Sequence, residues 1–396
     1  MTDSIVITGL GVISAIGNDK AETLASLQSE KTGVGALRYL RTDHHEFPVG
    51  EVKMSDDEMK QKLGISAEPT TRTSLMGMIA MQEALQEAAL LDSHEQRVML
   101  VSGTTVGGMD KSEQYYLDYL NNDCRNDYIK THDCGATTEL IADYFGIFSM
   151  VTSISTACSS AANAIILGAN LIRSGQTDIA VVGGTECITK FHLNGFNSLM
   201  ILDHEQCKPF DANRAGLNLG EGASYIVIET EESAKKREAR ILGRLSGYGN
   251  ACDAFHQTAS SDDGEGAYLA MRKALGMAGL SPADISYVNA HGTGTPNNDV
   301  SESQALFRVF GHQLPYVSST KGLTGHTTSA SGAIETAICL LAMHHHFVPA
   351  NYGWHTAMEN GVKPVDKNIT NVELRHVMCN SFGFGGNDSS LIISQY

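Results

Sequence analysis

The sequence contains the same local pattern twice, once in each half of the chain. Residues Ser153–Ile172 run from an extended segment through a tight turn into a helix of small and apolar residues. Residues Val317–Leu341 follow the same order. A helix that is apolar all round is buried on all sides, as in the interior of a layered α/β protein. We therefore expect two similar α/β halves, with one reactive side chain, Cys158 or His326, in each turn.

Short apolar strands alternate with helical patterns along the rest of the chain, which predicts an α/β fold. Expected strands are Ser4–Thr8, Val98–Ser102, Ile179–Val182, Ala223–Glu229, Ile241–Tyr248, Ile285–Asn289, Tyr316–Ser319, Glu373–Ser381 and Ser389–Ser394; expected helices are Thr73–Ala89, Ala161–Ile172, Gly266–Gly276, Val300–Phe310 and Ser331–His344; Gly9, Gly11 and Gly17 are expected in turns. The charged segment Glu231–Arg240 separates the halves without a Pro-rich or Gly/Ser-rich linker. We predict units 1–240 and 241–396, packed as one body.

Charge and cysteine usage exclude several classes of protein. A net charge of −17 argues against non-specific binding to nucleic acid or to an anionic membrane surface. The longest apolar runs fall short of the ~18 residues that a membrane helix needs, and the N-terminus lacks the basic residues of a signal peptide. Eight cysteines without a C-x-x-C pair are typical of reduced thiols. We therefore expect an acidic cytoplasmic enzyme that binds neither nucleic acid nor membrane.

Cys158 lies where an extended segment meets a helix, in the run SISTACSSAANAI. A helix N-terminus carries a partial positive charge and leaves backbone N–H groups free, so we expect a lowered pKa for this thiol. Nucleophile elbows have the same strand–turn–helix placement. The alternative is a buried structural cysteine, which describes most cysteines.

Two histidines occupy matching Gly-rich loops after expected strands. His291 lies in VNAHGTGTPNND, and His326 ends the run KGLTGH, five residues after Lys321. Histidine is the side chain most often used for acid–base chemistry, so two in matching contexts beside a helix-start cysteine favour a catalytic set. We expect no metal, because neither a C-x-x-C nor an H-x-x-x-H pair anchors these residues.

The motifs around these residues resemble the β-ketoacyl-acyl-carrier-protein synthases. The matching runs are TACSSA at Cys158, NAHGTGTPNND at His291, KGLTGH at His326, NSFGFGG at 380–386, VITGLGVISAIGN at 6–18, KPFDANRAGLNLGEGA at 208–223 and DAFHQT at 253–258. The resemblance covers nearly the whole chain and is greatest to the elongating synthases of bacterial fatty-acid synthesis and to related polyketide ketosynthases. It implies a thiolase-like fold of two duplicated halves in α-β-α-β-α layers, and a homodimer. It also implies no cofactor of the enzyme's own, since substrates arrive on the phosphopantetheine of an acyl carrier protein.

The resemblance also implies a role for each matching residue. Cys158 would accept the acyl chain, and His291 and His326 would hydrogen-bond the malonyl thioester carbonyl while CO₂ leaves. The backbone N–H groups of Cys158 and Phe384 would form the oxyanion hole, and Phe384 would also be a mobile gate. The remaining roles are support for the second histidine region by Lys321 with Glu335 as its ionic partner, binding of the phosphopantetheine arm by Thr293 and Thr295, and structural roles for Asp299 and Glu302.

Three departures from the family pattern leave the substrate open. The chain reads GFGGND where the elongating synthases usually read GFGGTN, which leaves the hydrogen bonding around Asn387 and Asp388 undetermined. Leu217 stands where Phe is common, and the pair Ser160-Ala161 follows the nucleophile where other members vary. We expect fatty-acid elongation, with a ketosynthase of a type II polyketide or aryl-polyene pathway as the alternative.

Two further classes share the fold. A non-catalytic chain-length partner subunit lacks the cysteine, so the presence of Cys158, His291 and His326 argues against it. A thiolase uses a second cysteine near the C-terminus as a base, but Cys379 lies in a strand-like run and is expected in the core.

Docking of the carrier poses an electrostatic problem, because carrier proteins are acidic and this chain is acidic too. We expect a local basic patch at the entrance to overcome the repulsion. The candidates are Lys60, Lys62, Arg72, Arg125 and Lys130.

Overall fold

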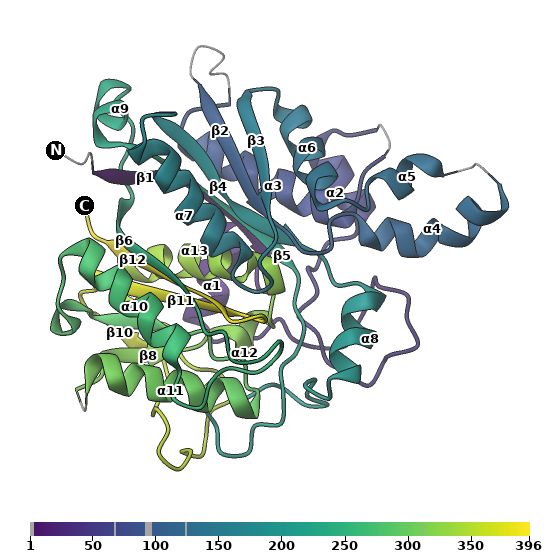
Figure 1. Ribbon diagram of the computed structural model, residues 1–396. Coiled ribbons are helices and arrows are strands. Elements are labelled where there is room, and N and C mark those ends of the chain that lie inside the picture. Colours follow the sequence, from purple (N-terminus) through teal and green to yellow (C-terminus); the bar gives the residue numbers. More distant parts are fainter. Residues whose placement is uncertain (1–3, 67–68, 92–96, 123–124, 312) are drawn as a thin grey trace.

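Ten strands form one mixed sheet in the computed structural model, which describes residues 4–66, 69–91, 97–122, 125–311 and 313–396 (Figure 1). The strands are β1 (Ile5–Ser14), β2 (Val98–Gly103), β3 (Phe148–Ile154), β4 (Ile179–Glu186), β5 (Gly222–Thr230), β6 (Gly243–Cys252), β7 (Tyr287–Asn289), β8 (Tyr316–Ser318), β11 (His376–Gly383) and β12 (Asn387–Ser394), with β9 (Phe347–Val348) and β10 (Ile369–Thr370) forming a separate pair. The helices are α1 (Lys20–Gln28), α2 (Asp56–Leu63), α3 (Arg72–Glu87), α4 (Met109–Asn121), α5 (Asn126–Lys130), α6 (Cys134–Phe145), α7 (Ser160–Arg173), α8 (Lys190–Ser198), α9 (Glu231–Lys236), α10 (Glu265–Ala278), α11 (Pro296–Phe310), α12 (Lys321–Thr324) and α13 (Ser331–His344).

The strand order repeats itself about the middle of the sheet. The order is β3-β2-β4-β5-β1 on one side and β6-β12-β11-β7-β8 on the other. When the strands of each side are numbered from 1 to 5 in chain order, the first side has the order 3-2-4-5-1 and the second side has the order 1-5-4-2-3. The second order is the first one read in reverse. The pairs Val6–Arg244 and Ile7–Gly243 join the two sides. We propose that the division between units lies at residues 240 and 241, between α9 and β6.

Helices cover the sheet in layers that follow from side-chain alternation. On β5, Tyr225 and Val227 pack with α3 and α6, whereas Ile226 and Ile228 point to the opposite face and pack with α7 and α13. On β12, Leu391 and Ile393 share that central core, whereas Ile392 packs with α10 and α11. The helices α7 and α13 therefore lie between the two five-stranded halves of the sheet (Figure 1). This arrangement confirms the expected α-β-α-β-α layers.

Most expected elements are present, but two glycines that we expect in turns lie within the first strand. Gly9 and Gly11 lie inside β1 rather than in turns. A Cβ would lie 2.3 Å from the Ala84 carbonyl oxygen at Gly9 and 1.9 Å from the Ala80 carbonyl oxygen at Gly11. Both glycines therefore allow α3 to pack directly against the strand. None of the helices in the described ranges is long and apolar enough to cross a membrane.

Candidate active site

Cys158 occupies a strained turn between β3 and α7. Ala157, the residue before it, has a φ of 50°, which is unfavourable for a residue with a Cβ. The backbone N–H of Thr156 donates to Ser160 Oγ at 2.9 Å, closing the turn over the helix start. Cys158 is only 5% exposed. The turn therefore fixes the direction of a buried sulfur at the N-terminus of α7.

The two histidines converge on this sulfur from the second half of the chain. His326 Nε2 lies 3.0 Å from Cys158 Sγ, and the rings of His291 and His326 meet edge to face with centroids 5.3 Å apart. One ligand-type atom of each of the three side chains lies within 4.8 Å of the others, which is close enough to hold a metal ion. The three residues come from separate loops, and their proximity agrees with the single catalytic set that the sequence motifs predicted.

Burial decides the charge state of all three groups. It raises the pKa of the Cys158 thiol to about 11, against the lowering effects of Lys321 and the Phe384 N–H. The lowered pKa that the helix N-terminus predicted is therefore wrong for the free protein, since desolvation of the thiolate outweighs the helix dipole. Burial, reinforced by Lys321, also holds the pKa of His291 and His326 well below the usual range. The site thus holds a thiol and two neutral imidazoles, and His326 is placed to accept the thiol proton.

Lys321 is a buried cation on α12 that orients His291. Its ammonium forms an ion pair with Glu335, the partner that the sequence indicated. It also donates to the His291 carbonyl oxygen at 2.6 Å and to His291 Nδ1 at 3.4 Å. Lys321 therefore contacts His291, whereas we expected it to support the region of His326. A donor at Nδ1 leaves the ring proton on Nε2, the nitrogen available to a substrate carbonyl.

Lys321→Met is expected to lower the free energy of unfolding by about 3–5 kcal/mol, because it leaves the buried Glu335 carboxylate without a cation. Urea denaturation measures this loss. The double variant Lys321→Met/Glu335→Gln removes both charges and should recover most of the stability. A single variant within about 1 kcal/mol of the wild-type protein would contradict a buried ion pair.

Two carboxylates fold the loop that carries His291. Glu302 accepts the backbone N–H groups of His291 at 2.8 Å and of Gly292 at 2.7 Å. Asp299 accepts those of Thr293 at 3.1 Å and of Gly294 at 3.2 Å. Both acids thus bind backbone N–H groups of this loop, and their structural roles stay a prediction.

A cavity of about 280 Å³ opens onto Cys158, His291 and His326. Its other lining residues are Phe196, Met200, Ile201, Leu217, Thr258, Ala259, Ser260, Thr293, Thr295, Pro296, Asn297, Asn298 and 382–386. Thr293 and Thr295 place their hydroxyl oxygens 2.9 Å apart on its wall. The Phe384 ring stacks on Phe196 with centroids 6.0 Å apart, and the Phe384 backbone N–H lowers the pKa of the Cys158 thiol. Phe196 and Met200, from α8 and the segment after it, carry no motif that sequence reasoning could have found.

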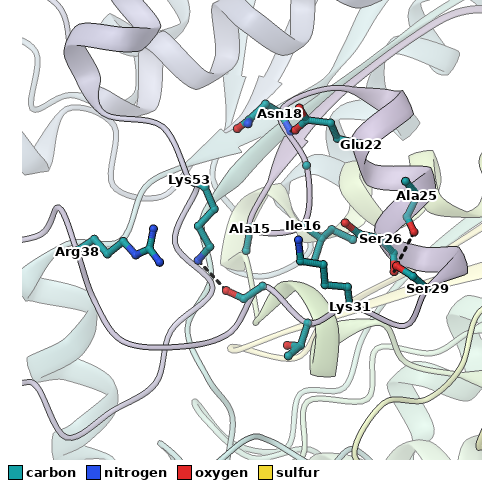
Figure 2. A pocket seen from close by; sticks show the side chains of 13 residues that line it. Ala15, Ile16, Asn18, Glu22, Ala25, Ser26, Ser29, Lys31, Arg38 and Lys53 are labelled. Carbon is teal, nitrogen blue, oxygen red and sulfur yellow. Dashed lines mark hydrogen bonds between the residues drawn. The ribbon is translucent and has the colours of Figure 1, made fainter.

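A larger cavity of about 640 Å³ lies beside α1 and shares no lining residue with the one at Cys158 (Figure 2). Lys31, Arg38 and Lys53 line it, and Lys53 Nζ donates to the Gly33 carbonyl oxygen at 2.8 Å. Cavity volume alone therefore does not identify the active site. The thiol and the two imidazoles that meet in one cavity identify it.

Asp388, one of the departures from GFGGTN, is a buried acid that is 3% exposed. Burial raises its pKa to about 8, and the nearby Asp253 and Glu302 add to the effect. The unfolded carboxyl titrates near 3.8. Between these values the folded state holds a proton that the unfolded state has lost, so stability falls as pH rises.

Asp388→Asn is therefore expected to stabilise the protein increasingly from pH 5 to pH 8, by up to about 1.4 kcal/mol per pH unit. Above about pH 8 the gain over wild type should level off. Urea denaturation across this range measures it, with the exposed Asp262→Asn as control. A difference independent of pH would show that Asp388 does not titrate in this window.

The structure excludes one of the expected docking residues. Arg72 is only 7% exposed, and its guanidinium lies 2.6 Å from Glu221 and 3.0 Å from Asp56. Arg72 is therefore a buried member of ion pairs with Asp56 and Glu221 and does not belong to a surface patch.

The other four candidates differ in their exposure. Lys62, Arg125 and Lys130 are exposed, and Lys60 is half-buried. Lys130 pairs with Asp127 at 3.0 Å, and its surface depression also contains Glu139 and Asp143. These four remain predicted docking residues.

A layered duplicated α/β fold with a buried thiol beside two imidazoles fits a condensing acyltransferase. Residues 2–234 match the family model described as "Beta-ketoacyl synthase, N-terminal domain", and residues 242–355 match "Beta-ketoacyl synthase, C-terminal domain". The chain belongs to the β-ketoacyl synthase family.

Its relatives resemble it over their full length. It is 31% identical to 3-oxoacyl-[acyl-carrier-protein] synthase 2 of Staphylococcus aureus (strain N315) and 32% identical to that of Coxiella burnetii (strain RSA 493), covering 99% of this chain and 98% of each relative. Among solved structures, the ishigamide ketosynthase/chain length factor superimposes with a TM-score of 0.93 at 30% identity, covering 100% of both chains. These matches agree with the thiolase-like fold.

Proposed function

We propose that this protein is a β-ketoacyl-acyl-carrier-protein synthase that elongates fatty acids. The observation that carries the proposal is the 3.0 Å contact of Cys158 Sγ with His326 Nε2, with His291 beside both groups in one cavity. The acyl-carrier synthases named above support the same activity.

In the first half-reaction Cys158 takes the acyl chain from the carrier. Its sulfur attacks the thioester carbonyl carbon while the thiol proton passes to His326 Nε2. The S–C bond to Cys158 forms, the bond to the carrier sulfur breaks, and the carrier leaves as a thiol with that proton. The backbone N–H groups of Cys158 and Phe384 bind the oxyanion between these events.

In the second half-reaction the two histidines stabilise an enolate. After the carrier thiol has left, His326 takes up a proton at Nε2 from water and releases the one on Nδ1. Neutral His291 and His326 then donate from Nε2 to the thioester carbonyl oxygen of the malonyl group, and its carboxylate leaves as CO₂. The electron pair of the broken C–C bond becomes the enolate, whose carbon attacks the acyl carbonyl on Cys158. A new C–C bond forms, the bond between the acyl carbonyl carbon and Cys158 Sγ breaks, and the released thiolate takes up a proton from water.

The substrates in this proposal are thioesters on the phosphopantetheine arm of an acyl carrier protein in the cytoplasm, and the enzyme uses no cofactor of its own. Thr293 and Thr295, whose hydroxyl groups face the cavity, bind the arm. The thiolase alternative gains no support, since Cys379 is 1% exposed in the central core and does not line this cavity.

We also propose a homodimer formed through β3. This strand lies at one edge of the sheet, and its residues are only partly buried. An edge strand with free backbone groups pairs readily with a second strand. The ishigamide structure, which contains a ketosynthase and a chain length factor, favours a type II polyketide ketosynthase with a second subunit as the alternative.

A panel of carriers tests the activity and separates the two pathways. The protein is mixed with malonyl carrier and with short, long, unsaturated or aromatic acyl carriers, and products are identified by mass spectrometry. We expect this protein alone, without a partner subunit, to convert saturated acyl carriers into β-ketoacyl carriers whose acyl chain is two carbons longer. Condensation of unsaturated or aromatic chains alone would favour the alternative, and no product from any chain would refute both.

A further inference from the structure

The side chain of Asn387 connects the turn that carries Phe384 to the turn that carries Cys158. Asn387 directly follows the Gly-Phe-Gly-Gly turn, and Ser159 directly follows Cys158. The Asn387 amide oxygen accepts hydrogen bonds from Asn163 Nδ2 at 2.8 Å and Asn250 Nδ2 at 2.9 Å. It also lies 3.2 Å from Ser159 Oγ, whose one proton is shared with the Thr156 carbonyl oxygen at 2.8 Å. One acceptor atom thus joins β12 to β6 and to the start of α7.

The partners of Asn387 also bond to one another. Asn163 Oδ1 accepts from Asn250 Nδ2 at 3.0 Å and from Ser389 Oγ at 2.8 Å. Asn163 Nδ2 donates in addition to Thr156 Oγ1 at 2.9 Å, in the Cys158 turn. We call Asn163, Asn250, Asn387 and Ser389 the amide cluster. Because its members share their hydrogen bonds, the cluster fixes the spacing between three elements.

The Phe384 turn has few other fixed points. Gly385 and Gly386 have φ values of 83° and 74° and carry no side chain. Two backbone hydrogen bonds hold the side of the turn that faces away from Asn387. The Gly385 N–H donates to the Gln257 carbonyl oxygen at 2.8 Å, and the Asp253 N–H donates to the Gly386 carbonyl oxygen at 2.8 Å. These bonds tie the turn to the loop after β6, whereas Asn387 ties it toward the sulfur.

We propose that Asn387 is a positioning residue, whose amide oxygen keeps the Phe384 N–H aimed at the sulfur of Cys158 and so sets the geometry of the oxyanion hole. The part concerning the oxyanion hole rests on the proposed function; the link between Asn387 and the sulfur does not. The sequence departs from GFGGTN at this residue, so the device belongs to this chain's own loop.

Loss of the Asn387 side chain should leave the fold intact. Ser159 Oγ still donates to the Thr156 carbonyl oxygen at 2.8 Å, and Asn250 Nδ2 keeps Ser389 Oγ at 3.0 Å. The effect should instead appear at the sulfur. Lys321 and the Phe384 N–H lower the pKa of Cys158, whereas burial, Glu186 and Glu335 raise it. In a variant that lacks the Asn387 side chain, only the effect of the Phe384 N–H on the pKa of Cys158 should change.

The test follows alkylation of Cys158 by iodoacetamide, read from the mass of its peptide, as a function of pH. Asn387→Ala should slow the reaction about 3–10-fold at a fixed pH below the thiol pKa, and shift the profile to higher pH. Asn387→Thr, which restores an acceptor, should lie closer to wild type. Asn170→Ala is the matched control, because Asn170 also lies on α7 and accepts a hydrogen bond from Tyr248 of β6 at 2.6 Å; its rate should equal the wild-type rate.

An unchanged profile for Asn387→Ala, or equal slowing by Asn170→Ala, would overturn the proposal. If Asn387→Ala does not fold, Asn387→Thr decides: we expect alkylation about 2-fold slower than wild type, and no slowing would overturn the proposal. In the condensation assay, Asn387→Ala should lower kcat about 10–100-fold with KM for malonyl carrier unchanged. Alkylation needs no carrier, so a wild-type protein without condensation but with this alkylation pattern would refute only the proposed function.

Discussion

Replacement of Cys158 by Ala is expected to abolish acyl transfer and condensation, with a loss of about 10,000-fold or more. The reason is chemical: the sulfur is the atom that forms the acyl bond, and no other thiol lines the described cavity. Transfer of a radiolabelled acyl group from the carrier to the protein measures the first step. Product formation from malonyl carrier measures the second.

Cys379→Ala is the matched control, because it removes a buried thiol from the central core without touching the cavity. It should keep the wild-type rate apart from a modest loss of stability. Condensation retained in Cys158→Ala would show that the nucleophile is another residue. Loss of activity only in Cys379→Ala would instead favour thiolase-type chemistry.

Replacement of either active-site histidine by Ala should lower decarboxylation of malonyl carrier about 100–1,000-fold, since each donates to the developing enolate. The two variants should differ in the first half-reaction. His326 touches the sulfur at 3.0 Å, so His326→Ala should also slow acylation of Cys158, whereas His291→Ala should leave it nearly unchanged. Release of CO₂ and acylation, measured separately, distinguish the two roles.

His344→Ala serves as control for these variants. His344, at the end of α13, bonds through Nε2 to the Leu242 carbonyl oxygen at 2.6 Å, away from the cavity. It should decarboxylate malonyl carrier at the wild-type rate. Decarboxylation by His291→Ala within about 3-fold of wild type would contradict the enolate role of that residue.

The sequence predicted the layered fold because its buried helices and strands are strongly patterned. Expected helix Ser331–His344 is observed with the same bounds, and the small residues of α7 and α13 do lie in the central layer. Gly9 and Gly11 show where pattern reasoning fails. A glycine marks close approach as well as a turn, and only the packing of α3 distinguishes the two.

The sequence identified the residues of the site, but it did not predict their charge states or all of their contacts. Motifs located Cys158, His291 and His326, but the helix N-terminus suggested a low thiol pKa, and burial reverses that direction. Arg72 was expected on the surface, because a single sequence does not show that Glu221, 149 residues away, pairs with it. The contact of Lys321 with His291 likewise depends on how α12 meets the loop after β7.

The central claim is that Cys158 carries the acyl chain, and mass spectrometry of the acylated protein before and after digestion tests it most directly. The wild-type protein is incubated with acyl carrier in the absence of malonyl carrier, then digested. We expect one acyl group per chain, located on the peptide that contains Cys158 and discharged as β-ketoacyl product when malonyl carrier is added. An unmodified Cys158 peptide, or an acyl group on any other residue, would contradict the account.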